Sequence, residues 1–309
     1  MKSYKIVSAL LLVAALTGCS QKLPYDLQGV EKGVVINIHK PLGAAAAMQQ
    51  DKSDVFDVIL DIPAQQGDWS MLDKAFLTAV YTHEGKKTSV DLDETVTEFP
   101  CTLKVKIADV CSKLGLSGDL SVGDRIEFTP SYTLKSGTVV RGWTSLIGFN
   151  NTTFSGWKME DGSSYSYRVA YTAFAPFVKE NFIGTGTLDD GYDTPVTVSE
   201  ISEKPDAKWI PTGVTEDNLI GLKLEGDIWF GGDVVKVWIN TLDYTLIVPD
   251  QVICPQWTYP GGAMGTYDGE IEDGEGEIDT LENTITFYLY SVWGPYSLGD
   301  GTLTISDIQ

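Results

Sequence analysis

The first nineteen residues constrain this chain more than any other stretch. Lys2 and Lys5 make a positively charged start, an apolar run follows over 6–16, and the chain then reads Leu16-Thr17-Gly18-Cys19. An apolar core of about 11 residues is too short to span a membrane, which takes roughly 20 residues as a helix. The order of charge, apolar run and small residues is that of a secretory signal peptide. We therefore expect residues 1–18 to be removed before the rest of the chain folds.

The tetrapeptide at 16–19 resembles the lipobox of bacterial lipoproteins. Small residues at Thr17 and Gly18 let an extended backbone enter a peptidase cleft, and Cys19 offers the thiol that becomes lipidated. The resemblance implies a chain that starts at Cys19, carries acyl chains such as palmitate there and folds outside the cytoplasm, on the outer membrane. Residues 19–33 then form a lipidated tether. The side of the membrane stays open, because 20–23 lacks the acidic cluster that cell-surface lipoproteins of some bacterial groups carry.

The composition of the remaining chain is typical of a globular β protein. The whole sequence holds 31 Gly, 13 Pro, 14 Tyr and 8 Trp, and Val- and Thr-rich runs alternate with turn residues. About 290 residues remain after the signal peptide, which is enough for two domains. We predict an all-β protein with one β domain over 34–178 and a second, acidic β domain over 179–309.

Within 34–178, alternation and turn residues mark several strands and one helix. Residues 55–62 alternate between an apolar and a mixed face, as in a half-buried strand. A hairpin turn is predicted at 83–86. The best helix candidate covers 108–114, where Val110, Cys111 and Leu114 share one face, and Gly115 ends it.

Three short motifs follow in a characteristic order: Leu114-Gly115-Leu116 after the helix, Val122-Gly123-Asp124 before a strand, and Lys135-Ser136-Gly137 at a turn. Over 34–147 this order resembles the N-terminal module of SusE-type lipoproteins, which belong to the outer-membrane glycan-uptake systems of gut bacteria. The resemblance implies an immunoglobulin-like β-sandwich with one short helix. It also implies an oligosaccharide ligand and outer-membrane transporter proteins as partners. No binding residues carry over from this family.

Charge is distributed unevenly between the two halves. Residues 1–178 hold 17 Lys/Arg and 19 Asp/Glu, a net charge of −2, and residues 179–309 hold 5 and 24, a net charge of −19. The acidic half would repel phosphate backbones, so we expect no nucleic acid as a partner. Neutral sugars and cations remain as ligands, and solubility is the simpler explanation of the charge. Seven or eight short runs between turns predict a β-barrel or a β-sandwich for this half.

The sequence lacks the motifs of common hydrolases and nucleotide-binding enzymes. His39 and His83 are its only histidines, and Cys101, Cys111 and Cys254 show no paired metal spacing. We predict that the protein is not an enzyme and has no cofactor other than a candidate Ca²⁺. A glycoside hydrolase stays a second alternative, because two acids close in space suffice for its chemistry. A bridge between Cys101 and Cys111 competes with burial of both as apolar core residues.

Aromatic residues in Gly- and Pro-rich segments give the candidate ligand site. Flat aromatic faces on loops bind the apolar faces of sugar rings, while Asp, Asn or Gln binds the hydroxyls. The alternative is that such rings seal loops onto the core. If they form a site, they should be partly exposed and meet around one cavity. The candidates are Trp257 and Tyr259 before Pro260-Gly261-Gly262, Trp293 and Tyr296 on either side of Gly294-Pro295, and Trp229 near Gly231-Gly232.

An acidic run at 267–280 gives a second candidate site. Asp273-Gly274 is a strong hairpin signal, and alternation in the two flanking strands would place every acid on one face. Oxygen ligands at this density suit Ca²⁺, and a fully solvated face is the alternative. The candidate metal ligands are Asp268, Glu270, Glu272, Glu275, Glu277 and Asp279.

Together these features predict a lipid-anchored, exported binding protein. The expected role is that of an accessory glycan-binding lipoprotein in an outer-membrane uptake system. The alternative is a structural or adhesion-type surface lipoprotein that binds another protein. Loop aromatics around one pocket favour the first role, and a flat apolar patch or an exposed strand edge favours the second.

Overall fold

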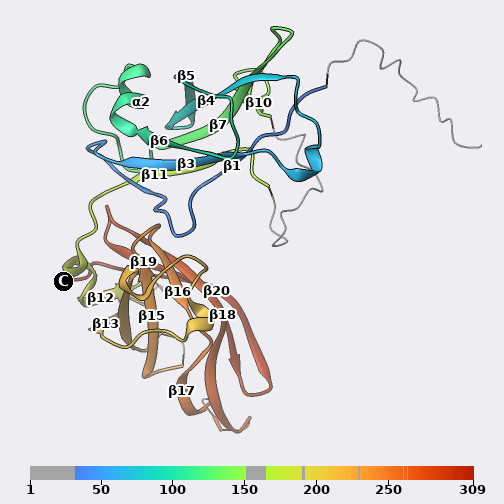
Figure 1. Ribbon diagram of the computed structural model, residues 1–309. Helices are drawn as coiled ribbons and strands as arrows, with labels where there is room; N and C mark the ends of the chain where they lie inside the picture. The colour runs from blue at the N-terminus through green and yellow to red at the C-terminus, as the bar shows by residue number, and fades with distance from the viewer. Residues whose placement is uncertain (1–31, 151–164, 190–191, 229, 260, 263) are drawn as a thin grey trace, which may run out of the picture. The chain divides into compact units, whose positions relative to one another are not determined.

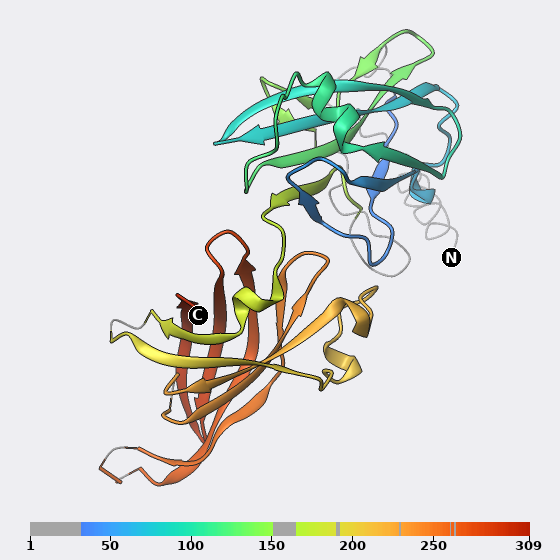
Figure 2. The ribbon, with the colours of Figure 1, turned by 90° about the vertical axis from the view of Figure 1, so that its left-hand side faces the viewer.

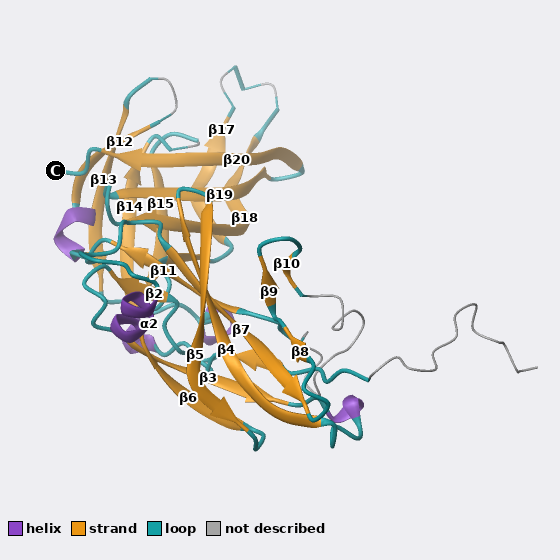
Figure 3. Ribbon diagram, turned by 90° about the horizontal axis from the view of Figure 1, so that it is seen from above, coloured by secondary structure: helices purple, strands orange, loops and turns teal. Residues whose placement is uncertain are grey.

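Strands dominate the computed structural model, which describes residues 32–150, 165–189 and 192–309 apart from Trp229, Pro260 and Ala263. Strands form 54 % of the described residues and helices 8 %, and Figure 3 shows this predominance of strands. The prediction of an all-β protein is therefore confirmed. The predicted signal peptide, Cys19 and nearly all of the tether lie outside the described residues. No helix in the described ranges is long and apolar enough to cross a membrane.

Residues 37–174 form three sheets. The first is antiparallel in the order β1-β3-β6, with β1 (Asn37–His39), β3 (Val55–Asp61) and β6 (Cys101–Lys106). A small two-stranded sheet pairs β9 (Trp143–Thr144) with β10 (Gly148–Phe149). The largest sheet has six strands in the order β2-β11-β7-β4-β5, with β8 paired to β7. Its strands are β2 (Ala47–Gln49), β4 (Leu72–His83), β5 (Lys86–Val96), β7 (Arg125–Leu134), β8 (Val139–Val140) and β11 (Val169–Phe174).

The two larger sheets share one hydrophobic core. Phe56, Val58 and Leu60 alternate along β3 and are all buried, as the period-two pattern predicts. The Phe56 ring stacks on Tyr171 of β11 with their centroids 3.8 Å apart. Burial of each such side chain stabilises the fold by about 1.5–3 kcal/mol. The opposite sheet contributes Ala75, Leu77 and Ala79 of β4 and Ile126 and Phe128 of β7 to the same core.

Local signals in this part of the sequence are confirmed by the structure. The predicted helix is α2 (Ile107–Lys113), whose Val110 and Cys111 are buried in the core. Gly115 ends the helical segment at φ +73°, a left-handed conformation that favours glycine. β4 and β5 form the predicted hairpin, in which Glu84 and Gly85 both have positive φ, as a tight two-residue turn requires.

Residues 184–306 form a closed antiparallel barrel with eight strands in its wall. Each strand follows its neighbour in the sequence, and the last strand returns to pair with the first through Thr187↔Ser306 and Leu188↔Ile305. Figures 1 and 2 show these strands in yellow to red, curving into one wall. The order is β12 (Gly184–Leu188), β13 (Thr194–Ile201), β14 (Leu219–Gly226), β15 (Asp233–Asn240), β16 (Thr245–Val248), β18 (Thr266–Asp279), β19 (Thr284–Trp293) and β20 (Tyr296–Ser306).

A ninth strand, β17 (Gln251–Thr258), continues along β18 where β16 ends. Short 3₁₀ helices occur at Ala64–Gln66, Lys179–Phe182, Ala207–Trp209 and Glu216–Asn218.

Apolar side chains fill the barrel interior. In several of its strands alternate residues are apolar and buried, for example Leu222 and Leu224 on β14, Val235 and Val237 on β15, and Ile285, Phe287 and Leu289 on β19. An eight-stranded barrel is just wide enough for its own side chains to fill it. The side chains that meet solvent therefore lie at the ends of the barrel and on its outer wall.

The predicted hairpin at Asp273-Gly274 is wrong. Residues 266–279 form the single strand β18, with a bulge between Glu272 and Glu275 at the expected turn. Both sides of β18 are occupied there, because Gly274 pairs with Val248 of β16 and the strand continues along β19. A chain held between two partners continues straight, and the local preference of Asp-Gly for a turn appears as a bulge.

Candidate functional site

Two neighbouring hairpins bring the predicted aromatic residues together at one end of the barrel. Trp293 is the last residue of β19 and Tyr296 the first of β20, with Gly294-Pro295 as the turn between them. Trp257 of β17 pairs with Tyr267 of β18, and Tyr259 follows one residue after β17. The segments predicted as loops are thus strand ends, because tight turns keep their aromatic residues on the sheet.

Trp293 lies at the centre of this group, which we call the aromatic cluster: Trp257, Tyr259, Tyr267, Trp293 and Tyr296. The Tyr296 ring stacks on Trp293 with centroids 5.3 Å apart. Trp257 meets Trp293 edge-on at 5.5 Å, and Tyr259 lies at 5.9 Å from it. The fifth ring, Tyr267, also meets Trp293 edge-on, at 5.2 Å. Aromatic pairs of this kind contribute about 0.5–1.5 kcal/mol each beyond their buried area.

Solvent exposure divides the aromatic cluster into a buried ring and rings that reach the surface. Trp293 is only 1 % exposed and donates its indole N–H to the Trp257 carbonyl oxygen at 3.0 Å. Its predicted partial exposure is therefore wrong, and Trp293 belongs to the barrel core. Tyr259 and Tyr296 are 47 % and 37 % exposed, and Trp257 is half-buried. The surface offered to a ligand is made by the two tyrosines and Trp257.

The residues next in sequence to Trp257 and Tyr267 form a polar pair. The backbone N–H of Gln256 donates to Asp268 Oδ1 at 2.8 Å, and the Gln256 side-chain amide donates to the same oxygen at 2.9 Å. These hydrogen bonds lower the pKa of Asp268, so its carboxylate stays charged. Carboxylates and amides recognise sugar hydroxyls, and exposed aromatic faces recognise sugar ring faces. Trp229, the remaining candidate, lies outside the described residues.

The acidic strand is a separate surface. The side chains of Glu272, Glu275, Glu277 and Asp279 are exposed, and Asp268 and Glu270 are half-exposed. No group of three or more His, Cys, Asp or Glu side chains with a metal-binding arrangement occurs within the described part of the chain. The alternation prediction is right in placing these acids on an outer face, and their Ca²⁺ role stays a prediction.

The three remaining cysteines are free thiols. Cys101 is half-buried on β6, Cys111 is buried on α2, and Cys254 is buried on β17. Burial raises the pKa of all three thiols. The two on β6 and α2 thus follow the alternative in which they pack as small apolar residues.

Sequence reasoning missed a polar cluster around Asp124. His83 Nδ1 lies 2.6 Å from Asp124 Oδ1, Tyr81 donates its hydroxyl to Oδ2 at 2.7 Å, and the Ser121 N–H donates to the same oxygen at 2.9 Å. Asp124 is buried, while the His83 side chain is 43 % exposed. The register Thr82↔Arg125 between β4 and β7 brings these residues together. That pairing joins distant segments and is invisible in the local sequence.

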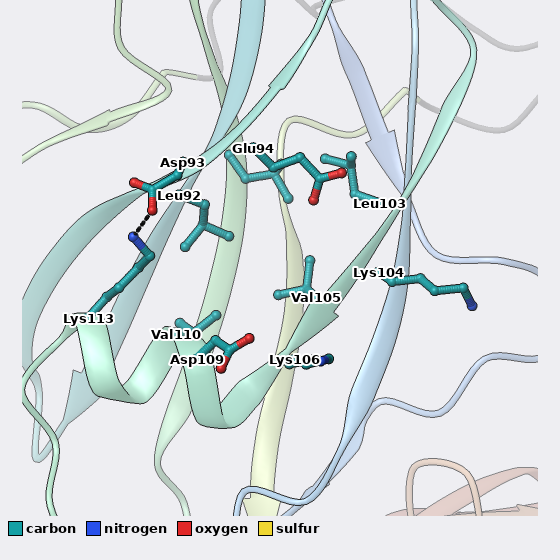
Figure 4. A pocket seen from close by; sticks show the side chains of 11 residues that line it. Leu92, Asp93, Glu94, Leu103, Lys104, Val105, Lys106, Asp109, Val110 and Lys113 are labelled. Carbon is teal, nitrogen blue, oxygen red and sulfur yellow. Dashed lines mark hydrogen bonds and ion pairs between the residues drawn. The ribbon is translucent and has the colours of Figure 1, made fainter.

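A small amphipathic pocket lies between α2, β5 and β6 (Figure 4). Its volume is about 190 Å³, and Leu92, Val105 and Val110 form its apolar wall. The Lys113 ammonium group pairs with Asp93 at 2.5 Å across one end. Three acidic and three basic residues line this pocket, so its charge favours neither anions nor cations. It lies on a different sheet from the aromatic cluster.

Comparisons with family models, with curated proteins and with solved structures found no match to this chain.

Proposed function

We propose that this protein is a lipid-anchored, exported binding protein that takes an oligosaccharide on the aromatic cluster. The observation that supports the proposal best is the gathering of Tyr259 and Tyr296 as exposed rings over the buried Trp293. Four aromatic residues singled out in separate segments thereby lie in one cluster, of which Tyr259, Tyr296 and Trp257 reach the surface. Exposed, rigid aromatic rings provide contact area with little loss of conformational entropy, which suits the weakly polar faces of sugar rings.

Export, lipid anchoring and the role in glycan uptake are proposed from the sequence. The lipobox at 16–19 supports anchoring through acyl chains on Cys19, and the chain order over 34–147 supports an immunoglobulin-like first module of the SusE type. An accessory role in a glycan-uptake system of the outer membrane, beside transporter proteins, follows from that resemblance. A binding protein without catalysis is the simplest role for such an arrangement.

A glycan array tests the proposed ligand class. The soluble chain lacking residues 1–19 should bind a restricted set of oligosaccharides, and the variant carrying both Tyr259→Ala and Tyr296→Ala should lose those signals. Circular dichroism of the variant checks that the barrel is folded. An array without reproducible signals for the wild-type chain would refute the proposed ligand class.

A further inference from the structure

The outer wall of the barrel carries a second surface, which begins three residues from Trp293 on β19 and four residues from Tyr296 on β20 and uses other side chains than the proposed glycan site. Cross-strand pairing aligns three strands into rows there: Glu272 with Tyr290 and Asp300, and Glu275 with Tyr288 and Thr302. A shallow hollow of about 550 Å³ lies between these rows, lined by Glu275, Tyr288, Tyr290, Asp300 and Thr302. We call this surface the acidic wall.

The segment of the chain that carries the acidic wall has no basic residues. Residues 237–309 contain twelve Asp or Glu and no Lys, Arg or His. Glu277 and Glu275 raise the pKa of the Tyr288 hydroxyl by their negative charge, and that field equally attracts a cation. Two tyrosine rings in the hollow add faces on which an ammonium or guanidinium group can rest. The chemistry therefore favours a Lys- or Arg-bearing ligand.

The edge of β20 next to this surface is open. Pairing with β12 covers only Ser306 and Ile305, and the Asp189 N–H donates to the Thr304 carbonyl oxygen at 2.8 Å. Among the described residues, no strand pairs with 296–303 on that side. Figure 3 shows β20 as a long strand that meets β12 only near one end. An open strand edge is a template on which another chain can add a strand.

The backbone N–H and C=O groups of successive residues in β20 point alternately toward β19 and toward the opposite edge. Ser306 and Thr304 face β12 with their backbone groups, and the pairing with β19 is regular from Ile305 back to Gly299. The N–H and C=O groups of Thr302 and Asp300 therefore point to the same, open side. Their side chains lie on the outer wall, because Leu303 and Ile305, at the alternate positions of the strand, pack into the barrel core.

We infer that the open edge of β20 and the acidic wall together bind an extended basic segment of a partner protein. The added strand pairs with Thr302 and Asp300 through its backbone. The Lys or Arg side chains of the added strand that face outward then lie on the acidic wall. There they contact the Asp300 carboxylate and the rings of Tyr290 and Tyr288. Main-chain hydrogen bonds supply affinity in this mode of recognition, and alternate side chains supply specificity.

The test uses the soluble chain lacking residues 1–19 and a short peptide of alternating Lys and Val, with a Glu/Val peptide as its matched control. Calorimetry should detect binding of the Lys peptide alone, and the Glu275→Gln/Asp300→Asn double variant should weaken it about tenfold. Thr302→Pro removes an outward N–H and should abolish binding, while Thr302→Val keeps the N–H and should retain it.

Three results would overturn the inference. Binding of the Glu peptide as strongly as the Lys peptide would remove the charge argument. Equal binding to Thr302→Pro and Thr302→Val would show that the edge takes no part. Self-association of the chain that Thr302→Pro abolishes, without any peptide binding, would identify a second copy as the occupant. Melting curves of each variant establish that it is folded before binding is compared.

Discussion

Trp293 supports the exposed rings of the aromatic cluster from beneath, and its own environment explains why it is buried. It pairs with Gly269 across β18 and β19, where an added Cβ on the glycine would lie 2.5 Å from the Phe230 ring. Because Gly269 has no side chain, the Phe230 ring can lie beside the Trp293 indole. The buried Trp293 therefore stabilises the barrel, and the proposed binding role belongs to the exposed aromatic residues above it.

This division predicts different effects on stability. Trp293→Ala should lower the free energy of unfolding by about 3–5 kcal/mol, since it empties a large core position. Tyr259→Ala should cost less, about 1–2 kcal/mol, because the half-exposed ring loses only its contacts with Trp257 and Trp293. Urea denaturation of the two variants and the wild-type chain measures both values. Equal losses in the two variants would contradict the placement of Trp293 in the core.

His83 should make stability depend on pH. The hydrogen bond to Asp124 and its negative charge raise the pKa of His83 above its ordinary 6.5, with Glu84 adding to the effect, and burial and Lys86 opposing it. A raised folded-state pKa means that this stabilisation is complete below about pH 6.5 and is lost as pH rises through the folded pKa. The melting temperature should fall over that window in the wild-type chain. His83→Gln should remove this component of the slope, and an unchanged slope would contradict the pairing.

At the scale of elements, the bulge in β18 shows how tertiary pairing overrides a local turn signal. The alternation of acids along 268–279 correctly indicated a strand with one solvated face. The position of the turn could not be predicted from Asp273-Gly274, because it depends on whether β16 and β19 occupy both edges of the strand. The helix at α2 and the turn at Glu84-Gly85 were predictable, since both depend on neighbours in the sequence.

Close packing around β18 gives a test of its register. A Cβ at Gly276 would lie 2.3 Å from the Thr286 carbonyl oxygen and 3.0 Å from Leu246 Cδ1. Gly276→Ala should therefore destabilise the chain by about 1–3 kcal/mol, as overpacking does. Glu277→Ala, next along the strand and exposed, is the matched control and should change stability by about 0.5 kcal/mol or less. Thermal unfolding of both variants decides whether this register holds.

At the scale of the whole molecule, sequence composition and structure agree on a β-rich chain. The fold of the second half could be predicted only in part from the sequence. Short, evenly spaced strands allowed either a barrel or a sandwich in the second half. The decision for a barrel depends on the pairing of β12 with β20, whose partners are about as far apart in the sequence as this half allows. Four members of the aromatic cluster were predictable, because Gly and Pro flank them in the sequence. Tyr267 was not predicted, because it joins the cluster only through the pairing of β17 with β18. The burial of Trp293 could not be predicted either, because it depends on the closure of the barrel.

The proposed membrane anchor is testable on the full-length chain. Cys19→Ala should leave the protein without acyl chains and move it from the membrane fraction to the soluble fraction, since no other anchor is proposed. Fractionation and mass spectrometry of the N-terminal peptide measure both changes, with Cys254→Ala as the control that should stay in the membrane. Wild-type protein without acyl mass, together with membrane association of both variants, would contradict lipidation at Cys19.

The most direct measurement of the central claim is the affinity for the oligosaccharide that gives the strongest array signal. Calorimetric titration should show saturable binding to the wild-type soluble chain. Tyr259→Ala and Tyr296→Ala should each weaken it about tenfold, as loss of one aromatic contact of about 1.4 kcal/mol predicts. Tyr288→Ala, on the acidic wall, should leave the affinity unchanged. Unaltered binding in both aromatic-cluster variants, or a loss in Tyr288→Ala instead, would contradict the assignment of the site.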